Sequence, residues 1–258
     1  MKWAWLSCCP LSGSDQGESI AMSRDPSLNA ASTFAADTTV LAAKGCNSLR
    51  LVVLESTVLP TSTALSITPL GLRDCRRKDG LTYVGCDKDQ ADFVVEGDGE
   101  LLDKRHFLLA YREGNYLLRD LGSASGTFVK VYRFFQLPAK CIVAFSDIHI
   151  EIRVFSLYVH LKVLTGEKIG QEFTFSSSLS PILIGRTATC SLVFHDSHLS
   201  RYQSSLVYQG SAGWTLFDGL NTAKPSRNGI WVYVLEDVTI WDGLIFKAGG
   251  SLFQAKLV

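Results

Sequence analysis

The feature that most constrains this fold is a succession of short runs rich in β-branched and aromatic residues. Examples are LTYVG (81–85), HFLLAY (106–111) and GIWVYV (229–234), and residues typical of turns separate such runs along the chain. Apolar residues at helical spacing are almost absent. Short strands with turns at regular intervals are typical of all-β sandwiches and barrels. We therefore expect an all-β protein.

The strand pattern occurs twice in the sequence. The segment YVGCDKDQADFVV precedes LIGRTATCSLVFH by 100 residues, and LLDKRHFLLAY precedes HLSRYQSSLVY by 97. This period is too long for a solenoid repeat and fits two tandem copies of one domain of ordinary size. We predict a disordered tail at 1–47, a first β-sandwich at 48–156 and a second at 157–258.

The predicted tail is rich in Ser, Ala, Thr and Asp and has no strand or helix period, which is why we expect it to be disordered.

Composition and charge limit the kinds of partner that the protein can bind. The net charge is zero, which argues against bulk attraction to nucleic acid. No run of eighteen apolar residues exists, so we expect no transmembrane helix, and acylation of Cys8 and Cys9 is the alternative route to a membrane. Seven scattered cysteines without a C-x-x-C pair indicate free thiols in a reducing compartment.

Three short motifs in the second copy occur in a fixed order. Gly185-Arg186 ends one strand, Ser200-Arg201 precedes another, and Asn228-Gly229 opens a third. In this order and at domain spacing they resemble the forkhead-associated (FHA) domain, a β-sandwich that binds phosphothreonine peptides through loops at one end. The family pattern is Gly-Arg, then Ser-x-x-His, then Asn-Gly-Thr. Gln203 replaces the histidine and Ile230 replaces the threonine, and the resemblance covers about 49–258.

The resemblance implies a site for a phosphorylated peptide. A phosphothreonine carries roughly −1.5 to −2 charges, and arginine and serine supply the donors that such an anion needs. On this interpretation two arginines and a serine hold the phosphate, an asparagine holds the peptide main chain, and a third arginine adds charge. The expected binding residues are Arg186, Ser200, Arg201, Arg227 and Asn228, and the structural positions are Gly185, Gln203 and Gly229.

The first copy keeps the scaffold pattern without these binding groups. Cys86 replaces the arginine, Asp103 replaces the serine and Ser125 replaces the asparagine. His106, which the resemblance makes a buttress between loops, is retained. A carboxylate about 4 Å from a phosphate costs roughly 1 kcal/mol in water and about 4 kcal/mol at an effective dielectric near 20. We therefore expect the first copy not to bind phosphopeptides.

No motif for an enzyme is present, neither G-x-S-x-G, a Walker loop, H-E-x-x-H nor a dinucleotide fingerprint. His195, Asp196 and His198 lack a further ligand at metal-binding spacing, so we expect no metal and no cofactor. We predict a non-catalytic adaptor of the cytosol or nucleus that binds a threonine-phosphorylated protein and has no small-molecule substrate. The alternatives are a phosphate-independent protein scaffold and, less consistent with the sequence, a hydrolytic site in the loops.

The positions of three tryptophans suggest which side chains fill the core of the second copy. Trp214, Trp231 and Trp241 all fall in or next to strand-like runs of the second copy. Large aromatic side chains contribute much of the apolar area that a core buries. We expect all three to fill the core of the second sandwich.

Overall fold

The structure is a computed structural model that describes residues 48–220 and 224–258. The predicted tail, including Cys8 and Cys9, lies outside the described residues. Within the described part the chain forms twenty-one strands and two short 3-10 helices, η1 (Ser177–Leu179) and η2 (Gly210–Ala212). The all-β class is confirmed. No helix among these residues is long and apolar enough to cross a membrane.

The strands follow the repeat of the sequence. The first copy contains β1 (Leu49–Ser56), β2 (Ala64–Thr68), β3 (Gly71–Leu72), β4 (Leu81–Gly85), β5 (Phe93–Val94), β6 (Phe107–Arg112), β7 (Asn115–Asp120), β8 (Thr127–Val131), β9 (Phe134–Gln136), β10 (Lys140–Phe145) and β11 (Ile148–Phe155). The second contains β12 (Tyr158–Val163), β13 (Glu172–Ser176), β14 (Ile182–Gly185), β15 (Leu192–Val193), β16 (Ser204–Tyr208), β17 (Trp214–Asp218), β18 (Ile230–Tyr233), β19 (Val238–Thr239), β20 (Ile245–Ala248) and β21 (Ser251–Leu257).

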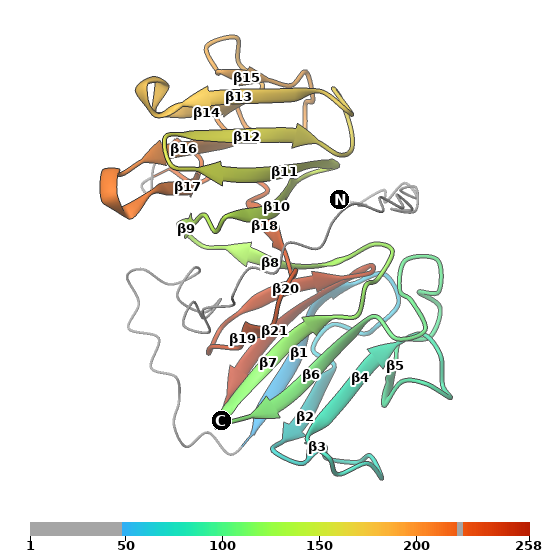
Figure 1. Ribbon diagram of the computed structural model, residues 1–258. Helices are drawn as coiled ribbons and strands as arrows, with labels where there is room; N and C mark the ends of the chain where they lie inside the picture. Colours follow the sequence, from blue (N-terminus) through green and yellow to red (C-terminus); the bar gives the residue numbers. More distant parts are fainter. Residues whose placement is uncertain (1–47, 221–223) are drawn as a thin grey trace, which may run out of the picture.

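Three sheets build two stacked sandwiches (Figure 1). An 11-stranded sheet runs through the molecule in the order β13-β12-β11-β10-β18-β8-β20-β21-β1-β2-β3. One five-stranded sheet, β19-β7-β6-β4-β5, packs on the β1 side, and the other, β15-β14-β16-β17-β9, packs on the β12 side. Side chains alternate along the strands, so that Leu49, Leu51 and Val53 of β1 are buried and Arg50 is exposed.

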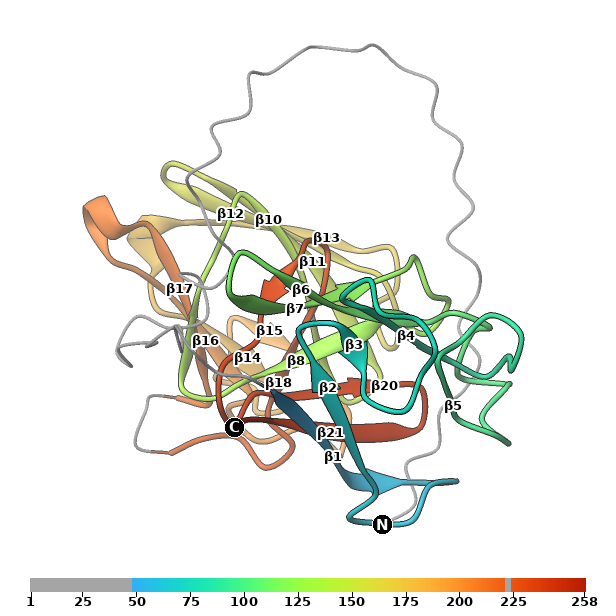
Figure 2. The ribbon, with the colours of Figure 1, turned by 90° about the horizontal axis from the view of Figure 1, so that it is seen from below.

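The two sandwiches do not coincide with the two sequence copies that meet at residue 156. The first sandwich consists of β1–β8 and β19–β21, and the second consists of β9–β18, with β8 and β18 paired where the two meet. Nine of the 22 buried residues of the second core come from 131–152, and eight of the 21 of the first come from 234–255. The two copies have therefore exchanged their last three strands. Figure 2 shows the red C-terminal strands β20 and β21 beside the blue β1.

A very short connection explains the exchange. Only Ser156 and Leu157 separate β11 from β12, and the two strands pair as a tight antiparallel hairpin with Phe155 opposite Tyr158. A two-residue connection holds its flanking strands side by side. Since β12 belongs to the second sandwich, β11 must lie there too. Residue 156 divides the sequence repeats, but in space it is the turn of a hairpin.

The exchange also changes the positions of the tryptophans. Trp214 is buried in the second core, as expected. Trp241 packs against the first core instead, because it follows the exchanged strand β19. Trp231 is only partly buried, and the Lys247 Nζ lies 5.1 Å from the centroid of its ring. The prediction that all three fill the second core is wrong for Trp231 and Trp241.

Candidate functional site

Gly185 brings two motifs together at the end of β14. A Cβ atom at Gly185 would lie 2.3 Å from the carbonyl oxygen of Arg201, so no other residue fits without moving the backbone. The next amide, that of Arg186, donates to the carbonyl of Ser200 at 3.3 Å. The close approach of these two chain segments thus places Arg186 beside Ser200 and Arg201.

Ser200 joins the loop before β16 to the loop before β18. Its hydroxyl oxygen accepts a hydrogen bond from the backbone amide of Arg227 at 2.9 Å. The hydroxyl hydrogen remains available for another acceptor, because a hydroxyl donates one bond and accepts two. Ser200 is partly buried, whereas Arg227 is exposed. The contact therefore holds an exposed arginine next to an accessible hydroxyl.

Gln203 fastens these loops from below. It is fully buried, and its Oε1 accepts from the amide of Ser200 at 3.1 Å. Its Nε2 donates to the carbonyl of Gly229 and to the hydroxyl of Ser226, both at 2.9 Å. The replacement of the family histidine by glutamine thus keeps a buried bridge between the two loops.

Asn228 makes a further contact between loops. Its side-chain Nδ2 donates to the backbone carbonyl of His198 at 2.9 Å. The backbone carbonyl of Asn228 accepts from Trp231 Nε1 at 3.3 Å. One donor of the side chain that we expected to hold a peptide is thus bound within the protein. The side-chain oxygen has no hydrogen bond among the described residues.

Positive charge is concentrated at these loops. The second-sandwich loops, residues 186–191, 194–203 and 219–229, contain four basic side chains and one carboxylate, a formal charge of +3. Arg186, Arg201 and Arg227 are exposed, and none forms an ion pair with another described residue. Three unpaired arginines whose backbones adjoin Ser200 suit a small anion with several oxygens. The arrangement therefore has the charge and the donors that a phosphate group needs.

The first sandwich repeats the scaffold of this site. The buried His106 accepts from the amide of Asp103 with Nδ1 and lies 3.2 Å from the carbonyl of Gly126 with Nε2, which are the two contacts that Gln203 reproduces. Burial lowers the pKa of His106, which favours the neutral ring. The carboxylate of Asp103 accepts from the amide of Ala124, and Ser125 Oγ donates to the carbonyl of Leu101, each at 2.6 Å.

The charge of the corresponding loops is reversed. The first-sandwich loops, residues 86–92, 95–106 and 121–126, contain seven carboxylates and three basic side chains, a formal charge of −4. Asp103 occupies the place of Ser200, and Cys86 the place of Arg186. The two sandwiches therefore hold the same loop geometry with opposite charge.

Comparison with known proteins identifies the family. The model of the FHA domain matches residues 82–157 and 182–249, together more than half of the chain. The chain belongs to the FHA family, whose members are generally non-catalytic modules that bind phosphothreonine-containing proteins. The solution structure of the FHA domain of an Arabidopsis thaliana hypothetical protein is similar at 12% identity, covering 87% of this chain and 94% of that chain, with a TM-score of 0.36. No curated protein matches the chain.

Two features of the site were not predicted from the sequence. The first is the pair of buried hydrogen bonds with which Gln203, already expected at the histidine position, keeps the bridge between the loops; its amide oxygen and nitrogen, one acceptor and one donor, would have suggested this. The second is the pair of contacts that Asn228 and Ser125 make with the preceding loop. Both bind the carbonyl two residues before the position of Ser200 or Asp103. Only the folded loops show this correspondence.

Proposed function

We propose that this protein is an adaptor whose second-sandwich loops bind a threonine-phosphorylated partner protein. Arg186, Ser200 and Arg201 hold the phosphate, Arg227 adds charge, and Asn228 contacts the peptide main chain through its side-chain oxygen. The observation that carries the proposal is the group of three unpaired arginines whose backbones adjoin Ser200. A kinase acting on the partner then switches the interaction on, in the cytosol or nucleus.

The first sandwich takes no part in phosphate binding on this proposal. Asp103 would repel the dianion, and the thiol of Cys86 is a weak donor. The intact bridge through His106 keeps the loops folded nevertheless. Phosphopeptide binding should therefore depend on one sandwich alone.

The test is fluorescence anisotropy of the full chain against two peptide pools, one containing phosphothreonine and one containing threonine. A hydrogen bond to a charged partner contributes roughly 1.5–3 kcal/mol, so Arg186→Ala should weaken binding by about ten- to a hundredfold. Ser200→Ala should also weaken binding, because it removes the hydroxyl and the acceptor for Arg227. Arg112→Ala, an exposed arginine at the β6–β7 turn, is the matched control and should bind normally.

Equal binding of the two pools would reject the phosphate site. That result would favour a phosphate-independent scaffold, for which the engagement of Asn228 Nδ2 by the His198 carbonyl is the supporting observation. If Arg186→Ala binds the phosphothreonine pool as tightly as the wild type does, groups other than Arg186 hold the phosphate.

A further inference from the structure

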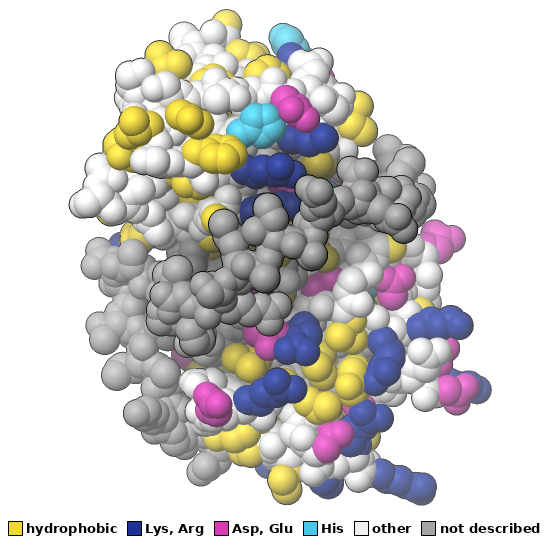
Figure 3. Space-filling view, in the orientation of Figure 1, with side chains coloured by type: hydrophobic (Ala, Val, Ile, Leu, Met, Phe, Trp, Pro, Cys, Tyr) yellow, Lys and Arg dark blue, Asp and Glu magenta, His cyan; other side chains and the backbone are white. Residues whose placement is uncertain are grey.

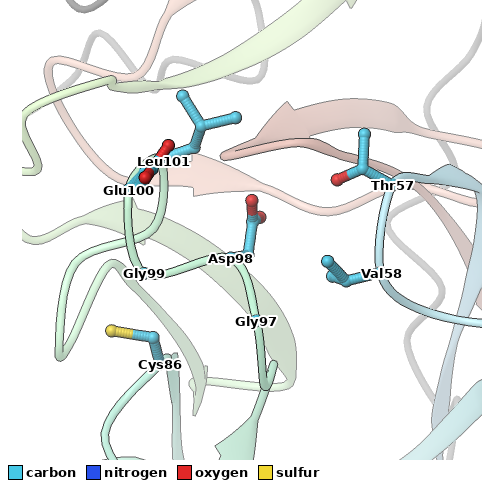
Figure 4. A pocket seen from close by; sticks show the side chains of 8 residues that line it. All are labelled: Thr57, Val58, Cys86, Gly97, Asp98, Gly99, Glu100 and Leu101. Atoms are coloured by element: carbon cyan, nitrogen blue, oxygen red, sulfur yellow. The ribbon is translucent and has the colours of Figure 1, made fainter.

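A shallow cavity of about 600 Å³ lies among the first-sandwich loops, facing the β1–β2 loop (Figure 4). Its walls come from three places that are distant in sequence. Thr57 and Val58 follow β1, Cys86 follows β4, and the loop after β5 supplies the remaining side chains, Asp98, Glu100 and Leu101. The cavity therefore combines two apolar walls with two carboxylates.

Asp98 is the most buried polar group of this cavity, with 4% of its surface exposed. Its Oδ2 accepts from the amide of Gly250 at 2.9 Å, and a Cβ atom at the neighbouring Gly249 would lie 2.6 Å from this oxygen. Oδ1 has no hydrogen bond and the carboxylate no ion pair among the described residues. Figure 4 shows the carboxylate directed between Leu101 and Thr57. A buried carboxylate without a cation is unfavourable, and burial raises the pKa of Asp98 accordingly.

The corresponding loops of the second sandwich are joined by a pair of side chains. There the loop after β15 meets the loop after β12 through His195 and Glu167, whose Nδ1 and Oε1 atoms lie 2.9 Å apart. In the first sandwich Asp98 faces Thr57 and Val58, neither of which is charged. The basic residues of the first-sandwich loops are directed elsewhere, since Arg105 stacks 3.6 Å from the centroid of the Tyr83 ring and no basic side chain pairs with Asp98 or Glu100 in the described chain.

The acidic charge is local to these loops. The loops carry a formal charge of −4, although Figure 3 shows Lys and Arg side chains spread over the neighbouring face of the first sandwich. An acidic cavity within a surface of mixed charge attracts a cationic group to one place. The charge of the loops therefore points to a cationic ligand.

We propose that this cavity binds a lysine or arginine side chain of a partner protein. Val58 and Leu101 contact the aliphatic stem, and Asp98 and Glu100 receive the charged end group. Long basic side chains commonly bury their stem against apolar groups in this way. The contact needs no phosphorylation, so a partner with a basic residue and a phosphothreonine would engage both sandwiches and gain affinity from the second contact.

The test is an NMR titration of the full, nitrogen-15-labelled chain with a peptide pool that has a fixed central lysine flanked by uncharged residues. A pool with acetyl-lysine at the centre is the control probe. The lysine pool should shift the amide signals of 97–101 and Gly250, and the acetylated pool should not. Glu100→Gln and Asp98→Asn should each weaken binding about tenfold or more, because each removes a charge-assisted contact.

Two matched variants sharpen the result. Asp89→Asn removes an exposed carboxylate of the same loops outside the cavity, and Glu236→Gln removes an exposed carboxylate between β18 and β19, so both should bind the lysine pool normally. Equal shifts with the two pools, no shift at all, or an equal loss in Asp89→Asn would overturn the proposal. A shift on adding calcium chloride without any response to the lysine pool would also overturn it, in favour of a cation site. Glu100 is exposed, so its variant decides the matter even if Asp98→Asn fails to fold.

Discussion

Residues 131–233 should fold as an independent domain, and more stably than residues 157–258, which form the second copy in the sequence. The first fragment contains all 22 buried residues of the second core. The second fragment lacks nine of them and must rebuild that part of the core with β19–β21. The two fragments are of nearly equal length, so a comparison of their stability isolates the effect of the exchanged strands.

The cost of that rebuilding follows from the pairing of equivalent strands. Val129 of β8 lies opposite Val232 of β18, and the two are equivalent positions of the two copies. Val129 also pairs with Phe246, and Val232 also pairs with Val143, so Phe246 and Val143 are equivalent as well. The equivalence continues along β10 and β11 against β20 and β21. Side-chain volumes differ at equivalent core positions of the two sets. Four of the replacements are Phe246 for Val143, Phe253 for Ile150, Ala248 for Phe145 and Ala255 for Ile152.

These mismatches are energetically large. Replacing Phe145 and Ile152 by alanines leaves cavities that cost about 2–5 kcal/mol each. Placing phenylalanines at the positions of Val143 and Ile150 overpacks the core and costs about 1–3 kcal/mol each. Even the low end of the total, about 6 kcal/mol, is comparable to the whole stability of a typical domain, about 5–15 kcal/mol. Residues 157–258 should therefore be unfolded or only marginally stable.

Urea denaturation followed by tryptophan fluorescence measures this difference, because both fragments contain Trp214, which is buried in the second core of the full chain. A cooperative transition is expected for 131–233, with phosphopeptide binding retained. For 157–258 we expect no cooperative transition. A transition of 157–258 at an equal or higher urea concentration than that of 131–233 would refute the strand exchange.

Two further predictions concern single residues, the buried Gln203 and the partly buried His149. Gln203→Ala should destabilise the protein by about 1–3 kcal/mol and weaken phosphopeptide binding, because the Ser200 amide and the Gly229 carbonyl lose their partner. Gln203→His should preserve both properties, as His106 does in the first sandwich, and thermal unfolding with anisotropy would show whether it does. Burial and the nearby charge of Lys247 lower the pKa of His149 from 6.5 to about 4. The folded state then binds fewer protons than the unfolded state below pH 6.5. The contribution of His149 to the free energy of unfolding is therefore fully present above pH 6.5, and the free energy of unfolding should fall by about 2.5 kcal/mol between pH 7 and pH 4.5. His149→Gln should lose less stability over the same range in urea denaturation, and an unchanged pH dependence would assign the loss to other groups.

The strands and the meeting of the three loops could be predicted because they depend on local pattern. A period of two marks the strands whichever sandwich they join, and Gly185, Ser200 and Asn228 stand at strand ends where loops meet. The bridge through Gln203 was harder to predict, because it depends on two buried contacts across separate loops rather than on spacing. A glutamine satisfies them as well as a histidine does.

The partner of each strand could not be predicted from that pattern. The residues that β10 and β20 contribute to the cores stand at alternate positions, so periodicity allows either strand to join either sandwich. Two other features decide between them. The connection of only Ser156 and Leu157 forces β11 to stay beside β12, and the sizes of the side chains at equivalent core positions fit only the exchanged arrangement well. Both were present in the sequence, as a very short connection and as different side-chain volumes at equivalent positions. A repeat therefore identifies which strands are equivalent, whereas connection length and side-chain volume determine which of them pack together.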